Sequence, residues 1–160
     1  MRYLVISDSH GYNGNLPKVM EMAGEVEAIF HLGDLQCAPE EIERVTKSNV
    51  IAISGNNDFR PELKPMRVIP REGHKILMTH GHRQMVNFGS LDRLVYLGEE
   101  NEADIVMFGH THVPCVRQQG RITLVNPGSI SLPRQGSRRP TFIIMEIKKD
   151  GSVTFDIHEL

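Results

Sequence analysis

Short apolar runs that each end in a cluster of polar residues are the feature that most constrains this chain. Five runs follow this pattern within residues 1–112, and each has the length of a buried strand. The runs predict a fold built from buried strands whose ends carry the chemistry. The clusters are, in chain order, Asp8-Ser9-His10, Gly33-Asp34, Gly55-Asn56-Asn57-Asp58, His80-Gly81-His82 and Gly109-His110-Thr111-His112.

The segments between these clusters alternate between helix and strand. Helical spacing of apolar residues predicts helices over 16–23, 39–47 and 91–100, and this alternation is typical of an α/β fold with a mostly parallel sheet. Turn signals such as Asp150-Gly151 then separate shorter runs, which predicts that antiparallel strands follow. The predicted strands span 3–6, 28–32, 50–53, 67–69, 75–79, 105–108, 113–116, 122–125, 142–147 and 153–157.

Composition limits the class of protein. A length of 160 residues suits one domain, which we expect to span 1–160, and 39% hydrophobic with 24% charged residues is ordinary for a soluble globular protein. A net charge of −2 gives no general attraction to nucleic acid, and no run approaches a membrane span of ~20 residues. The two cysteines, Cys37 and Cys115, are too few for a disulfide framework and predict a reducing, cytoplasmic location.

Parallel strands bring residues that are distant in sequence to one edge of a sheet, so we expect the five clusters to converge. Buried carboxylates and imidazoles cost several kcal/mol unless something neutralises them, and metal ions do this directly. Carboxylate, imidazole and amide ligands suit Mn²⁺, Fe or Zn²⁺ better than Ca²⁺ or Mg²⁺. About seven such ligands are too many for one ion. They suit two ions that share a bridging carboxylate, as in phosphatases and nucleases.

The order of these clusters, together with Asn126-Pro127-Gly128-Ser129, resembles the calcineurin-like metallophosphoesterases, and among them the small phosphodiesterases of the YfcE type. The resemblance implies two packed mixed β-sheets flanked by helices, an α/β-β/α sandwich. It also implies two divalent metal ions, Mn²⁺ first, with Fe, Zn, Ni or Mg as alternatives. The implied ligands are Asp8, His10 and His112 for the first ion, Asn56, His80 and His110 for the second, and Asp34 as the bridge.

One position departs from the pattern of the family. Many members carry a histidine after the Gly-Asn pair, and that histidine is taken to protonate the leaving group. Here the position is Asn57, whose amide can donate a hydrogen bond to a phosphate oxygen but cannot act as a general acid. His82 is the nearest substitute. Asp34, Asn57 and His82 are therefore the candidate catalytic residues.

The function implied by the resemblance is a metal-dependent phosphodiesterase acting on a small phosphate ester. A metal-bound hydroxide on the dinuclear site would attack phosphorus in line with the leaving oxygen. The alternatives are a phosphomonoesterase or nuclease of the same fold, or a non-catalytic protein-binding scaffold of the retromer-subunit type. Neither a nucleic acid nor a membrane is expected as a partner, and assembly into a homo-oligomer stays open.

Several residues outside this set have a structural interpretation. We expect His31 to be packed beside the ligands, His74 to be solvated and His158 to be inert. Asp58 is expected to orient a neighbour, and Cys37 to be a small buried residue rather than a nucleophile. The loop 133–140 carries Arg134, Arg138 and Arg139, a solvated cluster for which phosphate steering is the alternative role.

Overall fold

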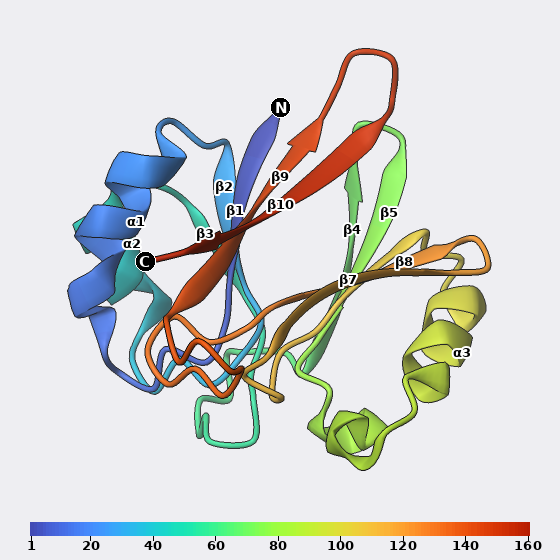
Figure 1. Cartoon of the computed structure of the whole chain (residues 1–160), viewed down its shortest axis with the longest axis horizontal. Coiled ribbons are helices and arrows are strands. Elements are labelled where there is room, and N and C mark those ends of the chain that lie inside the picture. The colour runs from blue at the N-terminus through green and yellow to red at the C-terminus, as the bar shows by residue number, and fades with distance from the viewer.

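The computed structural model describes residues 1–160 as two five-stranded sheets packed face to face (Figure 1). The first sheet has the spatial order β10-β9-β1-β2-β3, and the second has the order β4-β5-β6-β8-β7. The strands are β1 (Arg2–Ile6), β2 (Ala28–His31), β3 (Val50–Ala52), β4 (Met66–Arg71), β5 (His74–Thr79), β6 (Ile105–Met107), β7 (Pro114–Gln119), β8 (Ile122–Pro127), β9 (Thr141–Ile147) and β10 (Val153–Glu159).

Helices cover the outer face of each sheet. The helices α1 (Leu16–Ala23) and α2 (Pro39–Thr46) pack their apolar sides on the first sheet, and α3 (Asp92–Glu100) packs on the second. The four layers confirm the predicted sandwich. Three short 3₁₀ turns, at Asn13–Asn15 (η1), His82–Gln84 (η2) and Val86–Phe88 (η3), were not predicted.

The largest part of the core lies between the two sheets. Tyr3 and Phe30 stack with their ring centroids 5.2 Å apart on the first sheet, and Met78 and Met107 lie in the same cluster from the second. Helices bury the outer faces of the same strands. Strands that are buried on both faces carry continuous apolar runs rather than alternating ones, which is the pattern seen in the sequence.

The alternation of strands and helices at the start of the chain predicts parallel pairing, and the structure confirms it. The strands β1, β2 and β3 pair in parallel in the first sheet, whereas β5 and β6 pair in parallel in the second. The chain crosses between sheets after β3, and β9 later returns to pair antiparallel with β1. Pairing across so many residues leaves no local signal in the sequence.

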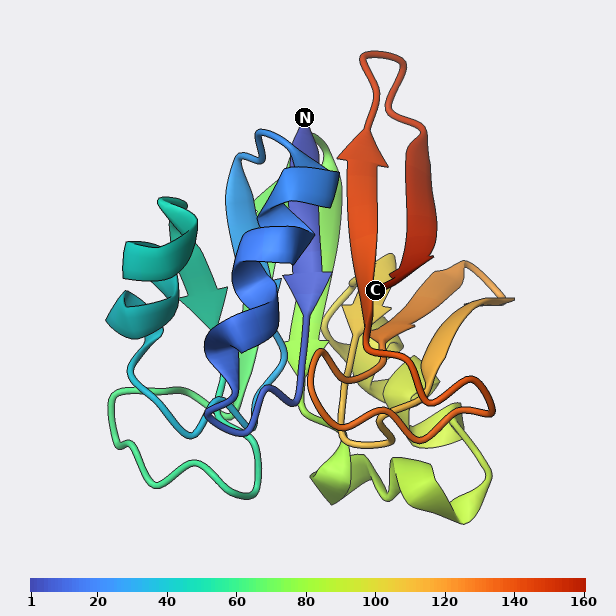
Figure 2. The same cartoon turned by 60° about the vertical axis from the view of Figure 1, so that its left-hand side comes forward.

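The two sheets place the ends of their parallel strands on the same side of the molecule. In Figures 1 and 2 the loops that follow β1, β2, β3, β5 and β6 gather at the lower end, and the β9–β10 hairpin projects from the opposite end. The five polar clusters therefore come together from two sheets rather than from one edge. No helix of the structure has the length and apolar character needed to cross a membrane.

Candidate metal centre

Four side chains form the buried middle of the lower end. Asp8 and His80 are fully buried, and Asp34 and His112 are almost so. The Nε2 atom of His112 lies 3.2 Å from Asp8 Oδ1, and that of His80 lies 3.4 Å from Asp34 Oδ2. His10 joins them from the rim, with its Nε2 atom 3.7 Å from Asp34 Oδ2. Two groups of potential metal ligands share Asp8: Asp8, His10 and His112 in one, and Asp8, Asp34 and His80 in the other.

Unusual backbone conformations turn these side chains toward one another. Five residues of the centre have positive φ angles between 47° and 67°, although none of them is glycine. Such conformations cost on the order of 1–3 kcal/mol each and tend to cluster at functional sites. The loops therefore hold a strained geometry that the rest of the fold stabilises. The five residues are Asp8, His10, Asp34, His110 and His112.

Two glycines allow the carboxylates to approach the backbone. A Cβ atom on Gly55 would lie 2.1 Å from Asp34 Oδ1, and one on Gly109 would lie 2.7 Å from Asp8 Oδ2. Neither glycine has a positive φ angle, so space rather than turn geometry requires glycine here. Any larger residue would displace a carboxylate of the centre.

Hydrogen bonds on the far side of three histidine rings fix their orientation. The Nδ1 atoms of His10, His80 and His112 lie 2.8 Å from Gln36 Oε1, 2.7 Å from Leu32 O and 2.6 Å from Leu132 O. Carbonyl oxygens only accept hydrogen bonds, so each Nδ1 carries the proton. In the neutral ring the Nε2 atom is then an unprotonated acceptor that faces the centre, as in metal-ligating histidines.

This tautomer creates an electrostatic conflict that a cation resolves. The Nε2 atoms of His10 and His112 face each other at 3.3 Å with a lone pair on each. Asp8 Oδ1 and His80 Nε2 are buried and have no hydrogen-bond partner in the protein. Unpaired buried polar atoms are costly unless a ligand satisfies them. The donor set, two carboxylates and three imidazoles, therefore fits divalent transition-metal ions.

The charges of the centre keep its carboxylates ionised. Burial by itself raises the pKa of Asp34, but the adjacent His80 ring and two hydrogen bonds from Asn57 hold it below its usual value. The pKa of Asp8 is also lowered despite burial, chiefly through His112. Burial lowers the pKa of His80, but Asp34 and Asp8 raise it overall.

The two adjacent asparagines differ in their contacts with the centre. Asn57 donates from its backbone N–H to Asp34 Oδ1 at 2.8 Å and from its Nδ2 to Asp34 Oδ2 at 2.7 Å. Asn56 is exposed and makes no side-chain hydrogen bond. The structure thus brings Asn57 against the central carboxylate, and the ligand role of Asn56 stays a prediction.

Two further histidines lie beside His80. The backbone N–H of His110 donates to Asp8 Oδ2 at 3.0 Å, and its ring centroid lies 5.1 Å from that of His80. The ring of His82 lies 6.0 Å from that of His110. Burial, followed by the charges of His80 and Arg83, lowers the pKa of His82, so its imidazole is neutral at pH 7.

Three of the structural interpretations are confirmed. His31 is fully buried and its Nε2 lies 2.9 Å from Ser9 Oγ, while burial lowers its pKa to about 4. Cys37 is buried. The Asp58 carboxylate accepts backbone hydrogen bonds from Leu35, Gln36 and Gly55, which joins the loop after β2 to the loop after β3.

Two interpretations were wrong. His74 was expected to be solvated, but its ring pairs with Asp104 and with the Gly151 carbonyl oxygen. His158 was expected to be inert at a frayed end, but it lies in β10 and stacks on Phe142 with centroids 5.1 Å apart. Both errors have the same cause, because the partners lie in distant strands and turns. Of the arginine cluster, Arg139 donates to the Leu160 carbonyl oxygen instead of facing the centre.

Sequence reasoning missed the residues that support the centre from outside. Gln36 accepts from His10, and Ser129 Oγ donates to the Asp8 carbonyl oxygen at 2.8 Å. Asn126 Nδ2 donates to the Gly109 carbonyl oxygen at 3.0 Å. The Asn126-Pro127-Gly128-Ser129 motif was the available signal for two of them, and Gln36 carried none beyond its closeness to Asp34.

Comparisons with known proteins agree with this arrangement. The family profile described as "Calcineurin-like phosphoesterase superfamily domain" matches residues 1–150. Phosphodiesterase YfcE of Escherichia coli is 30% identical over 86% of this chain and 83% of that protein. The crystal structure of a predicted phosphoesterase from Streptococcus pneumoniae is 34% identical with a TM-score of 0.84, covering 99% of this chain and 88% of that one.

Vps29 proteins are also similar in structure to this chain. Wild-type Vps29 of Entamoeba histolytica, crystallised in complex with Zn²⁺, is 25% identical with a TM-score of 0.75 over 99% of both chains. The match of the family profile to nearly the whole chain, and the relatives at 30% identity and above, lead to one assignment. The chain belongs to the calcineurin-like phosphoesterase superfamily.

Proposed function

We propose that this protein is a metal-dependent phosphodiesterase that hydrolyses small phosphate esters at the centre described above. The observation that carries the proposal is the pair of Nε2 atoms of His10 and His112, 3.3 Å apart beside two buried carboxylates. A donor set held in this way without internal partners is preorganised for divalent ions. Membership of the phosphoesterase superfamily supports the reaction class.

The residues divide between two ions as follows. Asp8, His10 and His112 would hold the first, and His80, His110 and Asn56 the second, with Asp34 between them. Mn²⁺ is our first choice, and Zn²⁺ comes next because the related Vps29 binds it. Two divalent ions at this place would activate water for attack and offset the charge of the phosphate.

The chain's own residues set the geometry of the donors. The Nδ1–H groups of the three rings donate hydrogen bonds to the oxygens of Gln36, Leu32 and Leu132. These hydrogen bonds hold each ring with its Nε2 atom directed inward. The two hydrogen bonds from Asn57 fix the rotation of the Asp34 carboxylate. Each ligand is thereby held before substrate arrives, which lowers the cost of reaching the transition state.

The side chains near the centre favour direct attack by water over a covalent intermediate. The Ser9 hydroxyl lies 2.9 Å from His31 Nε2, but both residues are fully buried, so a substrate cannot reach the hydroxyl. Burial raises the pKa of the Cys37 thiol, which keeps it protonated at neutral pH. Neither group is therefore suited to act as a nucleophile.

The leaving-group side lacks an obvious acid. The Nδ2 group of Asn57 is engaged by Asp34, and an amide is no proton donor in any case. General acid catalysis contributes ~10²–10⁴-fold, so substrates with a basic leaving oxygen should be slow. Aryl diesters, which leave as stabilised phenolates, should be hydrolysed readily and dialkyl phosphates slowly.

The test is a panel of metals and substrates on metal-stripped protein. Mn²⁺, Zn²⁺ and Mg²⁺ are added back in turn, and hydrolysis of bis(p-nitrophenyl) phosphate, p-nitrophenyl phosphate and dimethyl phosphate is measured. We expect metal-dependent turnover in which the aryl diester is fastest. Faster hydrolysis of the monoester would favour the phosphomonoesterase alternative, and no turnover with any metal would favour the protein-binding scaffold.

A further inference from the structure

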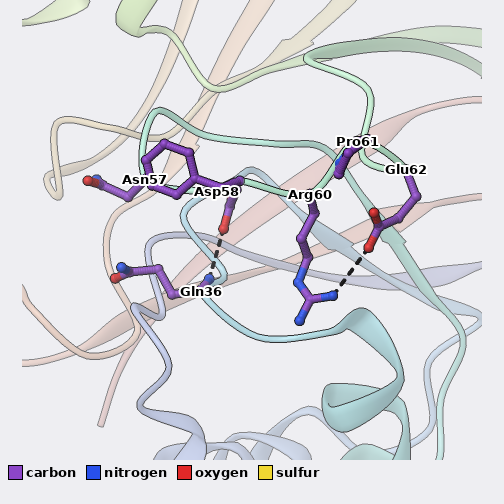
Figure 3. Close-up of a pocket in the computed structure, with 7 residues that line it drawn as sticks. Gln36, Asn57, Asp58, Arg60, Pro61 and Glu62 are labelled. Atoms are coloured by element: carbon purple, nitrogen blue, oxygen red, sulfur yellow. Dashed lines mark hydrogen bonds and ion pairs between the residues drawn. The ribbon is translucent and has the colours of Figure 1, made fainter.

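A cavity of about 450 Å³ lies directly beside the proposed metal centre (Figure 3). Its size is within the ~300–1,000 Å³ range of ligand pockets. Residues of the loop after β3 form most of the wall, and Gln36 from the loop after β2 completes it. The lining residues are Gln36, Asn57, Asp58, Phe59, Arg60, Pro61 and Glu62.

Two lining residues also contact the metal centre. Gln36 Oε1 accepts from His10 Nδ1 at 2.8 Å, and Asn57 donates to Asp34. Figure 3 shows the side chains of Gln36 and Asn57 extending to the same side, while Arg60 and Glu62 lie toward the other. The cavity therefore shares part of its wall with the residues that support the metal centre.

Hydrogen bonds fix the wall of the cavity. The carboxylate of Asp58 accepts three backbone hydrogen bonds, the shortest being 2.8 Å from Gln36 and from Gly55. The base of the loop is closed by the backbone N–H of Ser54, which donates to the Lys64 carbonyl oxygen at 2.9 Å. A cavity fixed in this way needs little ordering when a ligand binds.

The lining points to a planar ring with polar edges. Phe59 is 92% exposed, so its ring is free to stack against a ligand. Arg60 is paired with Glu62 at 3.2 Å, and with Asp58 the lining carries one cation and two carboxylates, which disfavours an anionic group. The amides of Gln36 and Asn57 offer hydrogen-bonding groups to the edge of such a ring.

We infer that this cavity binds the nucleoside arm of a phosphate ester, with the base stacked on Phe59. The inference rests on the proposed phosphodiesterase function, because it places the phosphate at the metal centre. Stacking of a base on an aromatic side chain contributes about 1–3 kcal/mol, which corresponds to a change in affinity of about 5- to 150-fold.

The test compares two phosphates that differ only in the arm. The dissociation constants of thymidine 5′-monophosphate and methyl phosphate are measured by calorimetry on Mn²⁺-loaded protein. In the wild type we expect the nucleotide to bind about 5- to 150-fold more tightly. In Phe59→Ala this preference should fall to near unity, while Phe59→Tyr, which keeps an aromatic ring, should retain it.

Phe88→Ala is the matched control. Phe88 is another exposed phenylalanine, with 79% of its surface accessible, but it lines a separate hollow with Met85 and Arg93. Its preference for the nucleotide should equal that of the wild type. A wild type without preference, or a preference that survives Phe59→Ala, would overturn the inference. Hydrolysis of bis(p-nitrophenyl) phosphate is measured on the same samples, so a protein that cleaves the diester without favouring the nucleotide loses only this inference. Nucleotide binding that depends on Phe59 without any hydrolysis would retain the cavity and reject the enzyme.

Discussion

The two ends of the molecule use the same residue types for different purposes. At the lower end, His80 Nε2 and Asp8 Oδ1 are buried without a hydrogen-bond partner. At the opposite end, both ring nitrogens of His74 have partners, Asp104 and the Gly151 carbonyl oxygen. A histidine–carboxylate cluster is thus not by itself a site. The absence of hydrogen-bond partners within the protein distinguishes the candidate metal centre from the His74 cluster, which joins the two sheets.

The glycines show the same contrast. Gly73 and Gly151 have positive φ angles in turns at the upper end, and a Cβ atom on either would meet nothing within 4 Å. At the lower end, Gly33 and Gly55 are required because other atoms lie too close for a side chain. Crowded glycines and positive φ angles at other residues thus occur together at the centre, although each also occurs elsewhere, as at Gly98 and Glu72.

Replacing one carboxylate at each end should give the largest difference in turnover and bound metal between the two ends. Asp34→Asn removes the charge proposed to bridge the ions, so we expect turnover to fall by well over ~10²-fold and bound metal to be lost, since even outer contacts of a metal are worth 10–100-fold. Asp104→Asn, at the other end, should leave both unchanged. Activity and elemental analysis of purified, Mn²⁺-loaded protein measure the effect. Near wild-type turnover in Asp34→Asn would show that the bridge is misassigned.

A methyl group placed beside the same carboxylate should act nearly as strongly. In Gly55→Ala the new Cβ would lie 2.1 Å from Asp34 Oδ1, so the carboxylate must move. We expect metal affinity to fall by roughly 10–100-fold, the range seen when the surroundings of a metal ligand are disturbed. Gly136→Ala is the control because its Cβ meets nothing within 4 Å. Equal Mn²⁺ affinities of the two variants, measured by titration, would mean that the loop after β3 accommodates the methyl group without displacing the Asp34 carboxylate.

Sequence reasoning reached the fold class and the convergence of the strand-end clusters because both depend on local patterns. Continuous apolar runs predict buried strands, and their ends meet whichever sheet they belong to. Residue patterns alone did not indicate the division into two sheets, which came from the family resemblance, since the pairing of β1 with β9 joins residues such as Leu4 and Ile144. His74 was misjudged for the same reason, because its partner Gly151 is 77 positions away.

The choice between Asn56 and Asn57 shows a finer limit. The two residues are adjacent and chemically identical, and only the backbone of the loop after β3 decides which amide turns toward Asp34. The family pattern fixes the order of residues but not the direction of each side chain. Gln36 and the cavity lined by Phe59 were unpredictable for a similar reason, as their role depends on contacts between two loops.

Removal of metal should lower stability by a moderate amount. Ligand at 100 times its dissociation constant stabilises the native state by about 2.7 kcal/mol, which for a chain of this size is roughly 5–10 °C in Tm. We therefore expect chelation with EDTA to lower the Tm of Mn²⁺-loaded wild type by that amount. Asp34→Asn, heated under both conditions, should show almost no difference. A Tm of the wild type that is indifferent to EDTA would argue against a bound metal in the native state.

The smallest effect is expected from the cluster at the upper end, and it depends on pH. Burial lowers the pKa of His74, but the hydrogen bonds to Asp104 and Gly151 and the charge of Asp104 raise it overall. A folded-state pKa above the unfolded value of ~6.5 means that the contribution is complete below pH 6.5 and is lost as pH rises through the folded pKa.

Urea unfolding of metal-free wild type and His74→Gln between pH 5.5 and 9 would measure this contribution. The difference in unfolding free energy should be largest at the acid end and shrink as pH rises, within the roughly 0–1 kcal/mol typical of partly exposed pairs. In an Asp104→Asn background the same substitution should give a difference that changes less with pH, because the hydrogen bond and charge of Asp104, which raise the pKa of His74, are absent. A difference that grows with pH in the wild-type background would mean that His74 is stabilised in its neutral form. The upper cluster would then be held by the hydrogen bond to Gly151 alone. The comparison of the two ends would no longer be between an ion pair and a set of metal ligands without partners. It would be between two neutral imidazoles in different surroundings.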